Sequence, residues 1–171
     1  MKKLILCGLL ALLIVPAFAQ DASVISDILA KPTATCMDFS YMVASELGME
    51  CSPFEAYSYC DRFGNFKFNK SPNAPVTVKD ISYFLMSNFG IKGGMMWSAF
   101  HNSRYAWKEL KANGFWKTGT DPDATLSGRD LVRAISKFVQ VYPDAMLKNP
   151  PAKEASDKYL KALLTDEEKQ L

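Results

Sequence analysis

The feature of this sequence that most constrains its fold is a helix-start pattern that occurs three times. Each copy has a hydroxyl residue, two variable residues, an aspartate and an apolar residue. The copies are Thr35-Cys36-Met37-Asp38-Phe39, Thr77-Val78-Lys79-Asp80-Ile81 and Ser127-Gly128-Arg129-Asp130-Leu131. In such a segment the hydroxyl accepts a hydrogen bond from a free N–H of the first helical turn, and the aspartate lies at the positive end of the helix dipole. We therefore predict that Thr35, Thr77 and Ser127 are structural caps, each followed by a helix.

Downstream of each pattern the apolar residues keep helical spacing. They recur at offsets of 0, 3, 4 and 8 from the last residue of the pattern, which marks one buried stripe. The stripes are Phe39, Met42, Val43, Leu47, then Ile81, Phe84, Leu85, Phe89, then Leu131, Ala134, Ile135, Val139. Gly48 and Gly90 follow the first two stripes, where a C-terminal glycine cap belongs.

A second apolar segment of helical character precedes each predicted capped helix. These segments run from Val24 to Leu29, from Pro53 to Tyr59 and from Ser103 to Ala112. The unit is therefore helix, loop, capped helix, and one unit cannot bury its apolar face alone. The sequence predicts an all-α domain of three packed units over residues 20–145.

Beyond this domain, the run Lys148-Asn149-Pro150-Pro151 interrupts the chain. Residues 146–171 are interpreted as a linker and a C-terminal amphipathic helix. That helix carries Tyr159, Leu160, Leu163 and Leu164 on one side.

The N-terminal segment predicts export. Lys2 and Lys3 precede an apolar run from Leu4 to Val15, and Pro16-Ala17-Phe18-Ala19 ends it with small residues that a signal peptidase accepts. We interpret residues 1–19 as a cleavable signal peptide, which places the mature chain in the periplasm or at the cell surface. The apolar run is shorter than the ~20 residues that span a bilayer, so no membrane span is expected after cleavage.

Charge and motif content exclude several functions. Without Lys2 and Lys3, Lys+Arg falls from 20 to 18 and equals the 18 Asp+Glu, and no cationic run remains to bind nucleic acid. The chain has no nucleophile–base pair, glycine-rich phosphate loop or metal-ligand spacing. We therefore expect a non-enzymatic protein with no catalytic residue, no cofactor and no metal.

The mature chain has an odd number of cysteines, Cys36, Cys51 and Cys60. Disulfides persist in an exported protein, so one bridge and one free thiol is the simplest expectation. Cys51 with Cys60 closes the shortest loop, but spacing alone leaves all three pairings open.

The second and third units together resemble a known family. In the third unit, Tyr105-Ala106-Trp107 is followed by Gly114, Gly119, Pro122 and Ala124 and then by Ser127 and Asp130. In the second unit, Gly64-Asn65-Phe66 is followed by Pro72, Ala74 and Val76 and then by Thr77 and Asp80. This order is similar to that of S-layer homology (SLH) domains, over about residues 21–142. The resemblance implies a pseudo-three-fold helical prism that binds cell-wall polysaccharide in grooves between repeats.

One position departs from that family. The family's ligand-contacting arginine follows the threonine, where this chain has Cys36, Val78 and Gly128. Lys79 and Arg129 stand one residue later, about 100° further round the helix.

The predicted function is an envelope structural or anchoring module that binds a wall-associated glycan. The candidate charge partners are Lys79, Arg104 and Arg129, and Tyr105 or Trp107 is the candidate stacking face for a sugar ring. Trp97 and Trp116 lie near them in the sequence, and Met95-Met96 is interpreted as a loop that fills gaps in packing.

Two alternatives remain open. In the first, glycan binding is lost and the chain is a periplasmic protein–protein interaction module, with 154–171 docking on an envelope protein. In the second, the domain is stabilised by calcium, because 69–80 and 119–130 can each be laid on a calcium-loop template.

Overall fold

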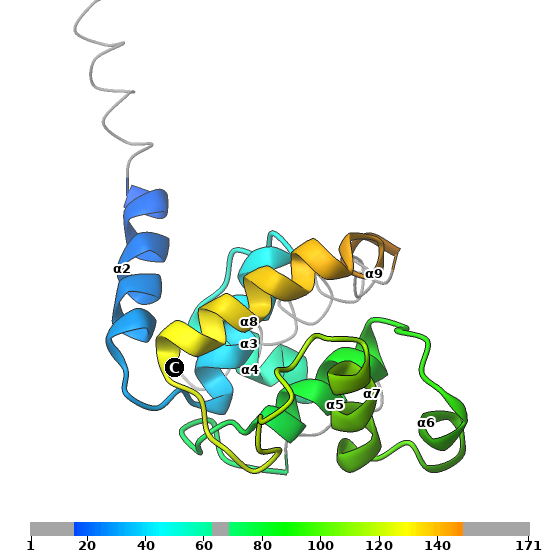
Figure 1. Ribbon diagram of the computed structural model, residues 1–171. Helices are drawn as coiled ribbons and strands as arrows, with labels where there is room; N and C mark the ends of the chain where they lie inside the picture. The colour runs from blue at the N-terminus through cyan, green and yellow to red at the C-terminus, as the bar shows by residue number, and fades with distance from the viewer. Residues whose placement is uncertain (1–15, 63–68, 149–171) are drawn as a thin grey trace, which may run out of the picture.

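The computed structural model describes residues 16–62 and 69–148, and this part of the chain is helical (Figure 1). Its helices are α2 (Pro16–Ala30), α3 (Cys36–Glu46), α4 (Pro53–Arg62), α5 (Val78–Asn88), α6 (Met95–Phe100), α7 (Ser103–Ala112), α8 (Gly128–Val141) and α9 (Pro143–Lys148). No strand occurs among these residues, although Thr35 with Pro75 and Thr77 with Thr125 form isolated antiparallel bridges. The expected all-α fold class is confirmed.

Each of the three capped helices begins at the residue that follows its predicted cap. At α3, the Asp38 N–H donates to Thr35 Oγ1 at 3.2 Å, and the Thr35 N–H donates to Asp38 Oδ2 at 2.9 Å. The Thr77 N–H likewise donates to Asp80 Oδ2 at 2.9 Å. Gly48 and Gly90 follow α3 and α5 with φ of 71° and 61°, a left-handed conformation that glycine adopts without steric cost.

The helices pair across the predicted units. α4 packs on α3, α7 packs on α5, and α2 packs on α8 (Figure 1). Each helix that leads into a capped helix therefore packs on the capped helix of another unit. The connections within the units, which lead into the capped helices, lie close to one another and position the candidate site described below.

Aromatic side chains join the capped helices in the core. The ring centroids of Phe39 and Phe84 lie 5.0 Å apart, those of Phe84 and Phe89 6.2 Å, and those of Phe89 and Phe138 5.3 Å. Each of these rings is at most 2% exposed. Rings from α3, α5 and α8 thus share one core, and edge contacts of this kind add to the stability given by burial alone.

The expected loop at Met95-Met96 is instead helical, because α6 covers these residues and is anchored by the buried Trp97. α9 crosses the expected domain end at residue 145 and begins at Pro143, a position where a helix tolerates proline. α2 begins at Pro16, ahead of the expected cleavage site. The rest of the predicted signal peptide and the predicted helix 154–171 lie outside the described residues.

Candidate functional site

The connections that lead into the capped helices are joined by backbone hydrogen bonds. In each case the first residue of a capped helix donates its N–H to a carbonyl in the connection before another capped helix. The bonds are Cys36 to Ala74 O (2.9 Å), Val78 to Ala124 O (3.0 Å) and Gly128 to Lys31 O (3.0 Å). Each of the three connections is therefore bonded to both of the others.

These three first-turn positions are closed to a ligand. Cys36 is 0% exposed and Val78 is 2% exposed. A Cβ added to Gly128 would lie 1.7 Å from the backbone oxygen of Ile28, at the end of α2. The positions at which the SLH resemblance would place arginine therefore face the neighbouring connection and have no room for a long side chain.

In each of the first two caps the aspartate forms an ion pair with a lysine. Lys31 Nζ donates to Asp38 Oδ1 at 2.6 Å, and the Asp38 side chain is only 4% exposed. Lys70 donates to Asp80, whose side chain is 15% exposed. Both carboxylates also accept from the backbone and hydroxyl groups of their own threonine caps. Neither carboxylate is therefore available to bind anything else.

The third cap is open. The Asp130 side chain is 57% exposed and accepts from Ser127 Oγ at 2.7 Å and from Arg133 at 3.1 Å. Beside it lies a cavity of about 390 Å³ between α8 and the connection 115–126. Its lining includes Trp116, Lys117, Thr120, Asp130, Arg133 and Lys137. We call this cavity the α8 groove.

Lys137 and Trp116 fix the walls of the α8 groove. Lys137 Nζ donates to the carbonyls of Gly114 (2.9 Å) and Phe115 (2.6 Å), which ties the connection to α8. The indole N–H of Trp116 donates to Ser82 Oγ on α5 at 2.8 Å. These bonds hold the connection in place before any ligand arrives, which lowers the entropic cost of binding.

The lining of the α8 groove suits an anionic, polar ligand. Three of its side chains, Lys117, Arg133 and Lys137, are cationic, and one, Asp130, is acidic. Lys117 and Arg133 are exposed, so both reach solvent at the mouth. Charge-assisted hydrogen bonds to carboxylate or phosphate oxygens are the strongest contacts that such groups make. The arrangement can therefore recognise charge and hydroxyl groups, and it has no nucleophile–base pair.

The cationic candidates from the sequence lie on three different helices. Lys79, on α5, bonds to the Asp123 carboxylate, and this bond raises the pKa of Lys79. Arg104 on α7 and Arg129 on α8 are exposed. None of the three lines the α8 groove or the cavity next to α6 described below.

The candidate stacking faces are occupied by other side chains. Tyr105 stacks on Phe100 with centroids 5.3 Å apart, and Lys108 Nζ lies 5.5 Å from the Tyr105 ring centroid. Trp107 is half-buried, its Nε1 is buried without a hydrogen-bond partner, and Lys111 lies 4.7 Å from the centroid of its ring. In this conformation neither ring offers the open face that sugar stacking requires.

The carboxylates of the calcium-loop template have other partners. The Asp123 carboxylate bonds to Lys79, and the Asp123 N–H donates to Asp121 Oδ1 at 2.9 Å. The carboxylates of Asp80 and Asp130 accept hydrogen bonds within their own helix caps. Within 16–62 and 69–148, no group of three or more His, Cys, Asp or Glu side chains is placed to hold a metal ion. The described geometry therefore lends no support to the calcium alternative.

Cys36 and Cys60 are free thiols, so the pairing that closes the shortest loop, Cys51 with Cys60, is not formed in this structure. Cys60 is buried, donates to Ser40 O at 3.9 Å, and its pKa is raised to about 12 by burial. Burial, followed by the Asp80 charge, raises the pKa of Cys36 to about 11. Cys51 is only half-buried. The two buried thiols are thus held in the protonated form, which does not attack disulfides.

Sequence reasoning missed the residues that form the α8 groove. A signal for them exists, because Asp130, Arg133 and Lys137 are spaced by three and four residues and therefore lie along one face of α8. What the sequence does not reveal is that the connection 115–126 covers this face.

Three comparisons, with known protein families, with curated proteins and with solved structures, gave no match. The site is therefore interpreted from its geometry. Among the described residues, no helix combines the length and the apolar character that crossing a membrane requires.

Proposed function

We propose that this chain is an exported, non-enzymatic module of the cell envelope that binds an acidic wall-associated polysaccharide in the α8 groove. The observation that carries this proposal is the lining of the groove, in which three cations and one acid surround a cavity beside Trp116. A volume of about 390 Å³ lies within the range of about 300–1,000 Å³ of small-ligand pockets.

The proposed architecture is a pseudo-three-fold arrangement of SLH-like repeats. Two features support it: the exchange of helices between units, and the backbone bonds that join all three connections. In this arrangement the first two units serve mainly as scaffold, since their cap carboxylates are already paired with lysines. The third unit retains an open groove and binds the ligand.

Within the α8 groove, we assign the direct contacts to Arg133 and Lys117. Both are exposed at its mouth, whereas Lys137 already donates to two carbonyls. Lys137 and Trp116 are positioning residues that hold the connection against α8 and α5. Lys79 and Arg129 remain candidates for a second contact point along an extended polymer.

The test is retention of the mature chain on purified cell wall that carries its polysaccharide. We expect the double variant Lys117→Gln/Arg133→Gln to lose affinity about tenfold or more, because each lost bond to a charged group is worth about 1.5–3 kcal/mol. Salt should weaken the wild type, since the contacts are charged. The matched control is Arg104→Gln, which removes an exposed cation on α7.

Three outcomes would contradict the proposal. If the double variant is retained as well as the wild type, the α8 groove is not the site. If Arg104→Gln loses retention and the double variant does not, the ligand binds on α7. If retention persists after the polysaccharide is stripped and disappears after protease treatment of the wall, the partner is a protein.

A further inference from the structure

A second surface of the molecule centres on α6. The helix is anchored by Trp97, which is 6% exposed and lies edge-on to Tyr83 with centroids 6.0 Å apart. A Cβ on Gly93 would lie 2.5 Å from Trp97 Cδ1, so glycine there lets the indole pack beneath the chain. Phe100 also stacks on Tyr105, so α6 is held in place by side chains at two positions.

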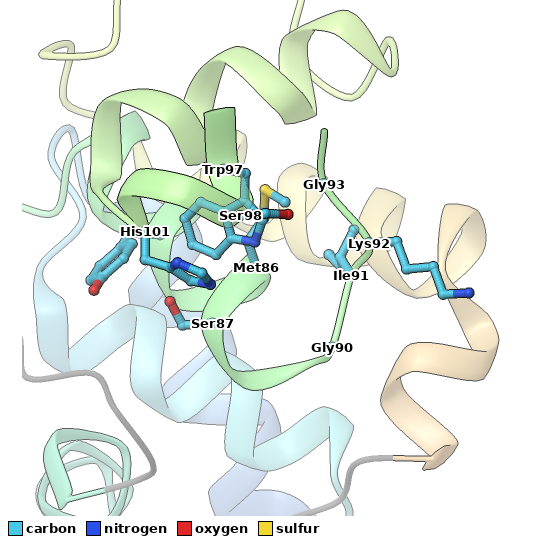
Figure 2. A pocket seen from close by; sticks show the side chains of 10 residues that line it. Met86, Ser87, Gly90, Ile91, Lys92, Gly93, Trp97, Ser98 and His101 are labelled. Atoms are coloured by element: carbon cyan, nitrogen blue, oxygen red, sulfur yellow. The ribbon is translucent and has the colours of Figure 1, made fainter. Parts of the chain in front are cut away.

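Behind this anchor lies a cavity of about 740 Å³, between α6 and the end of α5. Figure 2 shows the Trp97 indole beside His101, with Lys92 directed away from the indole on the other side of the 90–93 segment. The ring centroids of Trp97 and His101 lie 5.0 Å apart. Lys92 instead lines a second cavity with residues 141–145, at the junction of α8 and α9, and so faces away from α6.

The outer side of α6 is apolar and exposed. Met95 is 85% exposed, Phe100 is 57% exposed and Met96 is 45% exposed. The other large apolar side chains that are exposed among the described residues, Leu29, Phe54 and Val141, occur singly on α2, α4 and α8. Clustered exposure of this kind marks a surface that contacts something, whereas single exposed side chains are ordinary. We call Met95, Met96 and Phe100 the α6 knob.

The charges on α7 beside the α6 knob are mainly cationic. Residues 81–108 contain no Asp or Glu, although the chain has 18 of them, and they contain Arg104 and Lys108, both exposed on α7, the helix that packs on α6. The acid that approaches α6 is Glu109, whose Oε1 lies 2.9 Å from the point where a Gly94 Cβ would stand, at the start of the helix. The knob is therefore an apolar tip flanked by cations.

We propose that the α6 knob inserts shallowly into the surface of an anionic lipid bilayer. Met95, Met96 and Phe100 enter the boundary between headgroups and acyl chains, and Arg104 and Lys108 meet the anionic headgroups. Met, Phe and Arg are also common at protein–protein interfaces, but cations without an acid over residues 81–108 favour an anionic lipid surface as the partner. The surface is separate from the α8 groove and needs no wall ligand.

The test is flotation of the full mature chain with vesicles of phosphatidylglycerol or of phosphatidylcholine. We expect binding to phosphatidylglycerol, which salt weakens, and little binding to phosphatidylcholine. The double variant Met95→Ser/Phe100→Ser should bind at least about tenfold more weakly, because it removes most of the inserted apolar area. Arg104→Gln/Lys108→Gln should weaken binding at low salt and lose most of the salt dependence.

The matched control is Phe54→Ser, which removes an equally exposed aromatic ring from α4 and should leave flotation unchanged. Circular dichroism should show the same helical signal for all variants, since the changed side chains are exposed. Equal flotation of the wild type and Met95→Ser/Phe100→Ser would overturn the proposal. So would self-association of the wild type without vesicles that the same double variant abolishes, because the knob would then bind a second copy of the chain.

Discussion

The first and third caps share a sequence pattern and differ in what surrounds it. Asp38 and Asp130 each stand three residues after a hydroxyl cap, yet their side chains are 4% and 57% exposed. The difference arises upstream: four residues before the cap the first unit has Lys31, whereas the third has Asp123, whose charge is opposite. The same local pattern therefore gives a buried, ion-paired cap in the first unit and an exposed cap at the edge of the α8 groove in the third.

The largest expected effect comes from removing the buried carboxylate. Asp38→Ala should lower the free energy of unfolding by about 2–4 kcal/mol, because it leaves Lys31 and the Thr35 N–H without their shared acceptor. Asp130→Ala should cost about 1 kcal/mol or less, since its bonds are exposed to water. Urea unfolding followed by circular dichroism measures both. Equal losses would show that the two caps are energetically alike and would remove the contrast.

A second test concerns the first residue of α8. Gly128→Ala should cost about 1–3 kcal/mol, because the new Cβ meets the Ile28 carbonyl and forces α2 and α8 apart. Gly119→Ala is the matched control: a Cβ there has no atom within 4 Å, so stability should change by less than about 0.5 kcal/mol. The comparison is made by urea unfolding. A neutral Gly128→Ala would mean that α2 does not pack on α8 in solution.

The sequence predicts the helix starts well because capping is local. The Thr35 and Ser127 side chains accept from N–H groups three residues on, and the Asp80 carboxylate accepts from the Thr77 N–H. These local bonds let the patterns alone place α3, α5 and α8. The glycine that ends α5 is equally local, and Gly90 has the positive φ that its position demands.

The pairing of helices and the site residues could not be predicted in the same way. α4 packs on α3, and the connection 115–126 covers one face of α8, both through contacts between residues distant in the sequence. α6 was missed because it is short and its stability comes from tertiary contacts, the burial of Trp97 and the stacking of Phe100 on Tyr105. Short helices of this kind have little intrinsic stability for a pattern to reveal.

Cys36, the first residue of α3, should make the stability of the protein depend on pH. The Cys36 pKa is raised from 9.0 to about 11, so the folded chain keeps this proton at a pH at which the unfolded chain loses it. Release of the proton then favours unfolding, and stability should fall as pH rises from about 9 towards about 11. Urea midpoints at about pH 8 and about pH 10 measure the fall. Cys36→Val, which copies Val78 of the second cap, should show a smaller fall, and an identical fall would assign the pH dependence to other groups.

The smallest expected effect comes from the exposed pair that joins two connections. Lys79 bonds to Asp123, with side chains 38% and 67% exposed, whereas the partner of Lys31 is almost fully buried. Water and salt compete with the exposed pair, so Lys79→Gln should change the free energy of unfolding by less than about 0.5 kcal/mol. Urea unfolding with Lys31→Gln as the reference measures the contrast, and we expect the larger loss at Lys31. If Lys79→Gln were the more damaging change, the contact between the second and third connections would depend on this ion pair. The backbone bonds from Val78 to Ala124 and from Lys79 to Pro122 would then be too weak to hold these connections together alone.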